Sequence, residues 1–256
     1  MIFTITDSTG KVVRRLSGPT TAGIQRVNWD LRYPPATLPP PPNPEGEDPF
    51  NEGPSGPLVM PGTYKVSVAK RVNGVVTPMG QSQEFQIIVD GQDRMNPSDR
   101  IALVEFQTKV ARLQRAVQGA TQAANSLTPR FAAIRRALLD TPNAPEKLLD
   151  EAIALERRKN EILRALSGDQ ALRARNMNLP PSINERVGGI VGDQRMSTAR
   201  PTQTQIDQYA AAAAEFEGTL NQLRQLIEVD LAKLEKQMEA AGAPWTPGRI
   251  PEWKDQ

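Results

Sequence analysis

The apolar residues of this chain follow two different periods, and the change between them lies near residue 90. Before it, apolar and polar side chains alternate, as in "IFTITD" at the start, which is the pattern of a half-buried strand. After it, apolar side chains recur every three or four positions from Leu103 to Ala124, which is the pattern of an amphipathic helix. The chain has 256 residues, enough for two cores. The sequence therefore predicts two domains, residues 1–92 and 93–243.

Turn signals divide the first domain into short strands. "DSTG" follows the first strand pattern, and Asn73-Gly74 separates two further strand patterns, as in β-hairpins. Val27, Trp29 and Leu31 alternate with polar residues and indicate another half-buried strand. Five to seven short strands with such punctuation predict a small all-β sandwich.

A proline-rich loop, residues 34–61, interrupts these strands. It contains eleven of the chain's 23 prolines, and proline cannot donate to a sheet ladder, so no central strand fits there. One interpretation is a polyproline II ligand for a signalling domain, and the other is a stiff connecting loop. The sequence favours the loop because "PPPP" lacks the flanking basic residue that orients most such ligands.

The second domain is predicted to be an antiparallel four-helix bundle. Caps and breakers place helices from Pro97 to about Asn125, from Pro129 to "TPNAP", from Pro145 to "SGD", and from Thr202 to about Ala241. Between the last two, residues 168–201 are expected to be irregular, with a short helix near Ile183–Val187. An extended tail, 244–256, contains two of the three tryptophans. It is rich in proline, which does not continue a helix.

The composition excludes several kinds of chemistry. The chain has no histidine and no cysteine, and so lacks the usual ligands of zinc, haem and iron–sulfur clusters, a thiol nucleophile and the commonest general base. The formal net charge is +2 with both signs interspersed, which gives no electrostatic case for nucleic acid or an anionic membrane. No run of 18 apolar residues occurs, so no membrane-spanning segment is expected.

No catalytic, cofactor-binding or metal-binding residues are assigned from the motifs. Carboxylate pairs such as Glu235 with Glu239 lie among Lys and Arg at helical spacing, which favours solvated ion pairs over an acid/base dyad. "GGIVG" does not match a phosphate-binding loop. Asp90, Asp93 and Asp99 lie at the interdomain junction, where capping is favoured but a calcium ion stays an open alternative.

Two stretches of the sequence resemble known families. "ITDSTGKVVRRLSGPTTAGIQRVNWDLRY" followed by "MPGTYKVSV" resembles the Ig-like module of the flagellar hook-capping type found in secreted bacterial proteins. Together with "LPPSINERVGGIVG", "PTQTQ" and "GAPWTP", nearly the whole chain is similar to the C-terminal region of bacterial sortilin-like β-propeller proteins, also called glycosyl-hydrolase-like repeat proteins. The propeller of those relatives lies upstream and is missing here.

This resemblance implies an extracytoplasmic, non-catalytic accessory module, since glycosidase activity would belong to the missing propeller. A chain of this kind found alone is either a cut fragment or an extrinsic subunit, for example one that braces a photosynthetic reaction centre within its antenna ring. The resemblance implies the periplasmic face of a membrane as the location. Whether Met1 is the native start stays open.

The sequence analysis leads to one function and one alternative. We expect a non-catalytic, membrane-extrinsic scaffold that stabilises a larger assembly through contacts with other protein subunits, without a cofactor or small-molecule substrate. The alternative is a carbohydrate-binding or hydrolase-associated module, which would need exposed aromatic side chains, and only 5% of residues are aromatic. The proline loop, residues 168–201 and the tail are the expected contact segments, and the candidate contact residues are Tyr33, Phe50, Met177, Ile183, Trp245 and Trp253.

Overall fold

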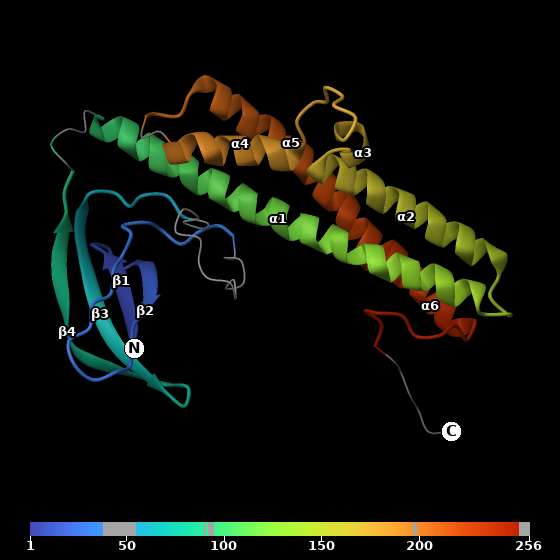
Figure 1. Cartoon of the computed structure of the whole chain (residues 1–256), viewed down its shortest axis with the longest axis horizontal. Coiled ribbons are helices and arrows are strands. Elements are labelled where there is room, and N and C mark those ends of the chain that lie inside the picture. Colours follow the sequence, from blue (N-terminus) through green and yellow to red (C-terminus); the bar gives the residue numbers. More distant parts are fainter. Residues whose placement is uncertain (38–54, 90, 92–94, 197–198, 251–256) are drawn as a thin grey trace. The chain divides into compact units, whose positions relative to one another are not determined.

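The computed structural model describes residues 1–37, 55–89, 91, 95–196 and 199–250 (Figure 1). The described chain is a mixed α+β protein, with a four-stranded antiparallel sheet followed by helices. It divides into two compact units. The sheet unit comprises Met1–Arg112 and Val191–Thr202, and the helical unit comprises Leu113–Ile190 and Gln203–Gln256.

The sheet has the strand order β2-β1-β3-β4. Its strands are β1 (Ile2–Asp7), β2 (Val12–Ser17), β3 (Gly62–Val72) and β4 (Val75–Ile87), and each neighbouring pair is antiparallel. The side chain of Asp7 accepts the N–H groups of Thr9 and Lys11 at 2.9 and 3.0 Å. This turn closes the predicted β1–β2 hairpin, because a short acidic side chain satisfies the backbone donors that the turn leaves free.

Two segments, residues 27–33 and 56–60, pack their apolar side chains on the core of the sheet, and we call them the crossing segments. Ile5, Val13, Val59 and Tyr64 form the buried core of this unit. Trp29 packs edge-on against Tyr64 and Phe85, with ring centroids 5.9 and 6.2 Å apart, a favourable arrangement for aromatic pairs.

The strand expected at residues 27–31 is wrong. Among the described residues, an isolated bridge between Arg32 and Leu58 and a hydrogen bond from the Arg32 guanidinium to the carbonyl of Gly56 at 3.1 Å join the two crossing segments, without forming a strand. The Asp30 carboxylate accepts the N–H of Arg32 at 3.1 Å, and Leu31 has a φ of 55°. A local side-chain bond of this type competes with strand formation and turns the backbone.

Helix α1 (Pro97–Leu139) is one continuous helix that contains Pro129. The expected break between two helices at residues 125–129 is therefore wrong. Proline cannot donate to the carbonyl four residues earlier, but Leu127, Phe131 and Ile134 on either side of it are almost fully buried. Burial of these side chains outweighs the lost hydrogen bond, since tertiary packing supplies most of the stability of helices in proteins.

The segment expected to be irregular contains two helices, the short α3 (Gln170–Arg173) and the longer α4 (Ile183–Met196). Ser182 and Glu185 form a capping box in front of α4: the Glu185 carboxylate accepts the Ser182 N–H at 2.7 Å, and the Ser182 hydroxyl accepts the Glu185 N–H at 3.4 Å. A capping box stabilises the start of a helix by satisfying its free N–H donors. This stabilisation offsets the low helix propensity of the three glycines within α4.

The helical unit is completed by α2 (Glu146–Ser167) and by the last long helix. The latter consists of α5 (Gln203–Arg224), a π-helical segment η1 (Gln225–Leu231) and α6 (Ala232–Ala240), close to the predicted bounds. α2 packs along all three of these segments (Figure 1). The core of the unit is apolar, and its largest fully buried side chains include Phe131, Ile134, Leu148, Ile162, Leu166, Ile183, Leu226, Leu231, Leu234 and Met238. A separate Ig-like sandwich and a four-helix bundle stay predictions.

Candidate functional site

The chain reverses direction directly after α6, and this reversal positions the tail that the sequence singled out. Gly242 has a φ of 74°, a conformation in which glycine is favoured. The N–H of Ala243 donates to the carbonyl of Met238 at 2.9 Å, and the N–H of Gly242 donates to the carbonyl of Glu239 at 3.0 Å. This pair of bonds is a Schellman motif, which satisfies the last carbonyls of the helix. It also brings Ala243 into the core of the helical unit.

The tail then forms an ordered structure around a tryptophan, which we call the Trp245 cap (residues 243–250). The Arg249 guanidinium lies 4.3 Å from the ring centroid of Trp245. It also donates to the Glu239 carboxylate and, at 3.2 Å, to the carbonyl of Pro244. The Arg249 side chain is only 4% exposed, whereas Trp245 is 45% exposed. The indole is thus held in one position and still offered to solvent.

The cap is braced from α1 and α6. Arg130 on α1 forms an ion pair with Glu235 on α6. A methyl group added at Gly248 would lie 3.0 Å from the Arg130 guanidinium carbon, so the arginine packs closely under the backbone of the cap. Thr246 is buried in the same place. These contacts mean that Trp245 is fixed before any partner arrives, which lowers the entropy cost of binding.

The predicted contact residues have different positions. Trp245 lies in the cap, and Met177 is 53% exposed after α3. Ile183 is wrong as a contact residue, because it is completely buried in the core of the helical unit. Phe50 and Trp253 lie outside the described residues.

Tyr33 packs within the sheet unit and is not a freely exposed contact residue. It packs partly buried against the sheet core, its N–H donates to Pro57 at 2.8 Å, and its carbonyl accepts from Arg14 at 3.2 Å. Burial raises the pKa of the Tyr33 phenol. In the same core, burial raises the pKa of Tyr64 to about 12, and its hydroxyl donates to the carbonyl of Met60 at 2.6 Å.

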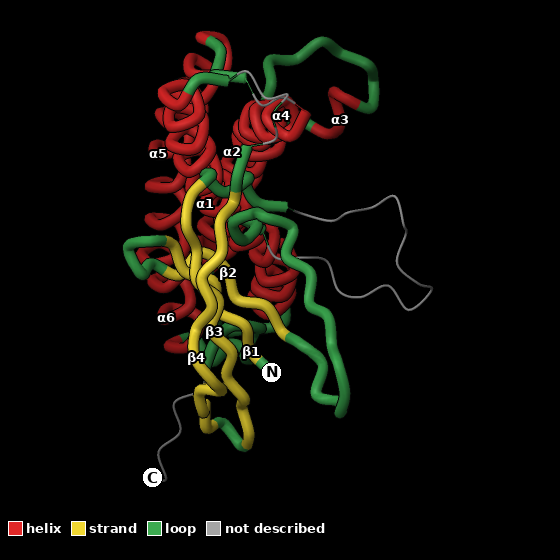
Figure 2. The backbone as a smooth tube through the Cα atoms, turned by 90° about the vertical axis from the view of Figure 1, so that its left-hand side faces the viewer, coloured by secondary structure: helices red, strands yellow, loops and turns green. Residues whose placement is uncertain are grey.

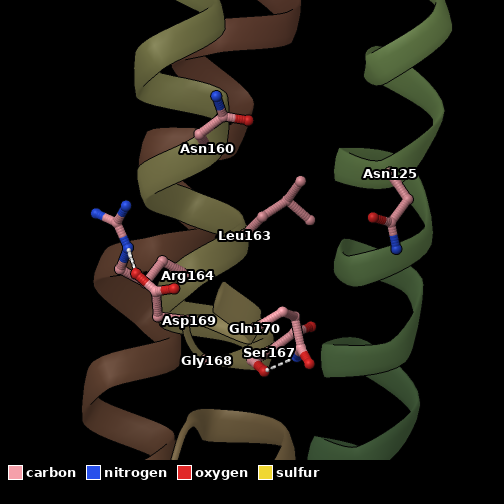
Figure 3. A pocket seen from close by; sticks show the side chains of 8 residues that line it. All are labelled: Asn125, Asn160, Leu163, Arg164, Ser167, Gly168, Asp169 and Gln170. Atoms are coloured by element: carbon pink, nitrogen blue, oxygen red, sulfur yellow. Dashed lines mark hydrogen bonds and ion pairs between the residues drawn. The ribbon is translucent and has the colours of Figure 1, made fainter. Parts of the chain in front are cut away.

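A polar groove lies between α1 and α2 in the helical unit (Figure 3). Asn125 and Leu163 point into it from the two helices, with Asn160 further along α2. At its other end, Asp169 accepts from Arg164 at 3.0 Å and from the N–H groups of α3. Its lining side chains offer amide groups but no aromatic ring, which gives a sugar no stacking surface.

A second cavity, of about 250 Å³, lies within the sheet unit. Its apolar lining includes Leu58, Val59 and Leu103, and its charged lining side chains are Arg32, Arg100 and Arg195. No carboxylate lines it. The cavity suits a small apolar group and carries no acid/base pair among its lining residues.

Two carboxylates in the helical unit titrate below their usual range. Backbone hydrogen bonding from α3, chiefly from the N–H of Leu172, lowers the pKa of Asp169, with Arg164 also contributing. Hydrogen bonding from Arg173, followed by bonds from Ser182, lowers the pKa of Glu185. Both groups therefore stay ionised near neutral pH and act as caps and ion-pair partners. Within the described ranges, no cluster of three or more carboxylates that could hold a metal ion occurs.

Sequence reasoning found Trp245 but missed the residue that positions it. Arg249 follows the tryptophan by four residues, after "TPG", a spacing that lets the chain turn back so that guanidinium and indole meet. The lone arginine in a proline-rich tail was the available signal.

Comparisons with known proteins add no relative. No protein-family model, no curated protein and no solved structure matches this chain. Among the helices that the structure describes, none combines the length and the apolar character needed to cross a bilayer.

Proposed function

We propose that this chain is a non-catalytic, membrane-extrinsic accessory subunit that stabilises a larger assembly by contacts with other proteins. The Trp245 cap is the observation that carries the proposal. Tryptophan and arginine are both enriched among the residues that dominate protein–protein binding, and in the cap a half-exposed Trp245 is held by Arg249. The proposal places the chain at the periplasmic face of a membrane, and a complex of a photosynthetic reaction centre with its antenna is one assembly of this kind.

The architecture expected from the sequence fits this role. We propose that the sheet with its crossing segments is a reduced Ig-like sandwich, and that α1, α2 and the last long helix pack as an antiparallel helical bundle, in which the single helix α1 replaces the two helices expected within residues 97–139. Such modules offer rigid surfaces, which position partners without chemistry. The close bracing of the cap by Arg130, Glu235 and Arg249 supports a rigid contact rather than an adaptable one.

Retention of partners by the immobilised chain tests the proposal. The wild-type chain and Trp245→Ala are exposed to detergent-solubilised membranes from the source cells, and retained proteins are quantified. Ile206→Ala is the matched control, because Ile206 is an apolar side chain of similar exposed fraction, 41% against 45%, in the same unit. We expect Trp245→Ala to weaken retention at least tenfold, as for a dominant contact residue, and Ile206→Ala to leave it unchanged.

The opposite result would overturn the proposal. If the wild-type chain retains no defined set of proteins, or if Trp245→Ala retains the same set as wild type, the cap is not a contact site. A parallel screen against immobilised glycans tests the alternative function. Tight retention on a glycan without co-purifying protein would favour a carbohydrate-binding module instead.

A further inference from the structure

The β3–β4 hairpin extends beyond the rest of the sheet (Figure 2). The last β1–β3 pair is Ile2 with Ala69, while the β3–β4 ladder continues to Val72 with Val75. We call residues 70–79 the hairpin tip. Within the described residues, the tip is a two-stranded ribbon with no third strand beside it, and all its side chains are exposed. It therefore adds nothing to the core of the sheet unit.

The tip is nevertheless well formed. Asn73 and Gly74 have φ values of 49° and 84°, the conformation of a type I′ turn, whose twist matches that of the flanking strands. The pairs Arg71 with Val76 and Val72 with Val75 close the ribbon directly before the turn. The tip is thus presented in one shape.

Apolar side chains gather at this exposed end. Val72, Val75 and Val76 are 57%, 66% and 53% exposed, and Met79 on the same strand is also exposed. Single exposed apolar residues are normal. Here four exposed apolar residues lie within ten positions, at the end of a ribbon that supports no core. Such a cluster of exposed apolar side chains indicates an interaction surface.

The charge at the tip has one sign. Lys70 and Arg71 are the only charged residues between positions 66 and 83. The nearest acidic residue along β4 is Glu84, which forms an ion pair with Lys65 at 3.6 Å. The positive and negative charges of the whole chain nearly cancel, so the net charge gives no case for an anionic membrane. The charges at the hairpin tip, however, are both positive.

We propose that the hairpin tip docks on an anionic lipid surface. The valines enter between the lipid headgroups, while Lys70 and Arg71 lie at the level of the phosphates and bind them. Apolar side chains that are flanked by basic side chains bind the membrane interface through two favourable contributions, which are burial of apolar surface and attraction to anionic lipid. A lipid surface fits the tip better than a protein partner does, because a narrow ribbon end presents little of the area that a stable protein interface buries.

This inference rests on the proposed membrane-extrinsic function and names the surface that the sheet unit contacts. It involves a different unit from the Trp245 cap, so the two can fail separately. Loss of lipid binding with intact partner retention would remove only the hairpin proposal. Lipid binding without any protein partner would remove only the scaffold proposal.

Vesicle sedimentation tests the inference with the full chain. The vesicles consist of phosphatidylcholine alone or of phosphatidylcholine mixed with phosphatidylglycerol, and two double variants alter the tip. Lys70→Gln with Arg71→Gln removes the charge. Val75→Thr with Val76→Thr removes apolar surface but keeps β-branched side chains, which suit a strand. Lys233→Gln with Lys236→Gln on α6 is the charge-matched control, because both lysines are exposed.

We expect the wild-type chain and the control to sediment with the anionic vesicles and not with phosphatidylcholine alone. Each basic residue near an anionic surface changes partitioning roughly fivefold, so the charge variant should bind more than tenfold more weakly. The valine variant should also lose most of its binding. Absence of wild-type binding, or equal binding by all variants, would overturn the inference.

A single cysteine gives an independent readout, because the chain has none of its own. An environment-sensitive dye on Val75→Cys should shift to the blue when anionic vesicles are added. The same dye on Ala132→Cys, at an exposed position of α1, should not shift. A shift at Ala132 alone, or at neither position while the protein sediments, would also overturn insertion of the tip.

Discussion

Arg130 on α1 and Glu235 on α6 form a two-point hydrogen-bonded ion pair. The Nε group of Arg130 donates to one carboxylate oxygen at 2.9 Å and a terminal nitrogen donates to the other at 2.8 Å. Both side chains are largely buried, 22% and 13% exposed. Because this geometry matches a planar guanidinium to a planar carboxylate, the pair links α1 to α6 and holds in place the arginine against which the cap lies.

The first prediction is that Glu235→Gln destabilises the helical unit. The variant keeps the shape of the side chain but removes the charge that Arg130 faces. The free energy of unfolding should therefore fall by the contribution of a charge-assisted hydrogen bond, about 1.5–3 kcal/mol. Urea unfolding followed by far-ultraviolet circular dichroism measures it. Glu217→Gln, at an exposed position of α5, is the control and should change the free energy of unfolding by less than about 0.5 kcal/mol. Equal effects of the two variants would contradict the role of the pair.

The second prediction concerns Lys159, a charged residue that is only 3% exposed. Its amino group donates to the Thr128 hydroxyl at 3.1 Å, and burial lowers its pKa from 10.5, although nearby Glu156 acts in the opposite direction. Replacement of a buried charge by an apolar side chain of similar length is often stabilising by about 1 kcal/mol or more. We therefore expect Lys159→Met to raise the free energy of unfolding at neutral pH.

The pH dependence follows from the same shift. The unfolded chain binds more protons than the folded one when the pH lies between the lowered folded-state pKa and 10.5, so the wild-type stability should rise across that interval. Lys159→Met should lack this rise, and the exposed Lys233→Met should keep it. Denaturant unfolding at a series of alkaline pH values gives the difference. If the free energy of unfolding of the wild type follows the same pH dependence as that of Lys159→Met, the lowered pKa of Lys159 would be disproved.

Much of the helical architecture could be predicted because burial requires a regular period. The predicted inner face of α1, from Leu103 to Ala124, is buried at all seven expected positions, which are Leu103, Phe106, Val110, Leu113, Val117, Ala120 and Ala124. In the last long helix, Ile227 packs partly buried against the core, while Leu226 and Leu231 are fully buried. These two are five positions apart, the spacing of a π-helical turn, which a search for the α-helical period does not find.

The errors have local causes of the same kind. Pro129 predicts a break between two helices, and "GGIVG" lies in a segment expected to be irregular, whereas packing of the flanking apolar residues keeps both stretches helical. Ile183 is predicted as a contact because it lies in residues 168–201, although the capping box of Ser182 and Glu185 is present in the sequence as S-x-x-E. The tryptophan tail was recognised from its composition. The bracing of Trp245 by Arg249 was not, because it depends on the path of the chain after Gly242.

The third prediction is that Gly56→Ala disrupts the layer that crosses the sheet. A methyl group at Gly56 would lie 2.0 Å from the carbonyl oxygen of Tyr33, which is backbone and cannot rotate away. The two crossing segments would have to separate, at a cost of about 1–3 kcal/mol or more. Trp29, whose ring nitrogen donates to the Arg32 carbonyl at 3.1 Å, should then lose its ordered environment.

Near-ultraviolet circular dichroism and thermal unfolding detect this loss. Gly119→Ala is the control, since its added methyl group meets nothing within 4 Å on α1 and should not change the aromatic signal. A Gly56→Ala protein with a wild-type aromatic signal and an unchanged melting temperature would show that the two crossing segments do not pack as described.

The last prediction concerns the glycines of α4. Gly188 and Gly189 lie inside the helix and are exposed, and a methyl group added at either one would have no neighbour within 4 Å. Neither has a positive φ, so alanine fits without strain. Since alanine is favoured over glycine in a helix interior by about 0.5–1 kcal/mol, the double variant Gly188→Ala with Gly189→Ala should be about 1–2 kcal/mol more stable. Urea unfolding measures the gain, and Gly242→Ala, at φ 74° in the Schellman motif, should be destabilised in the same assay. A loss of stability in the double variant would show that this stretch is not the helix that the capping box begins.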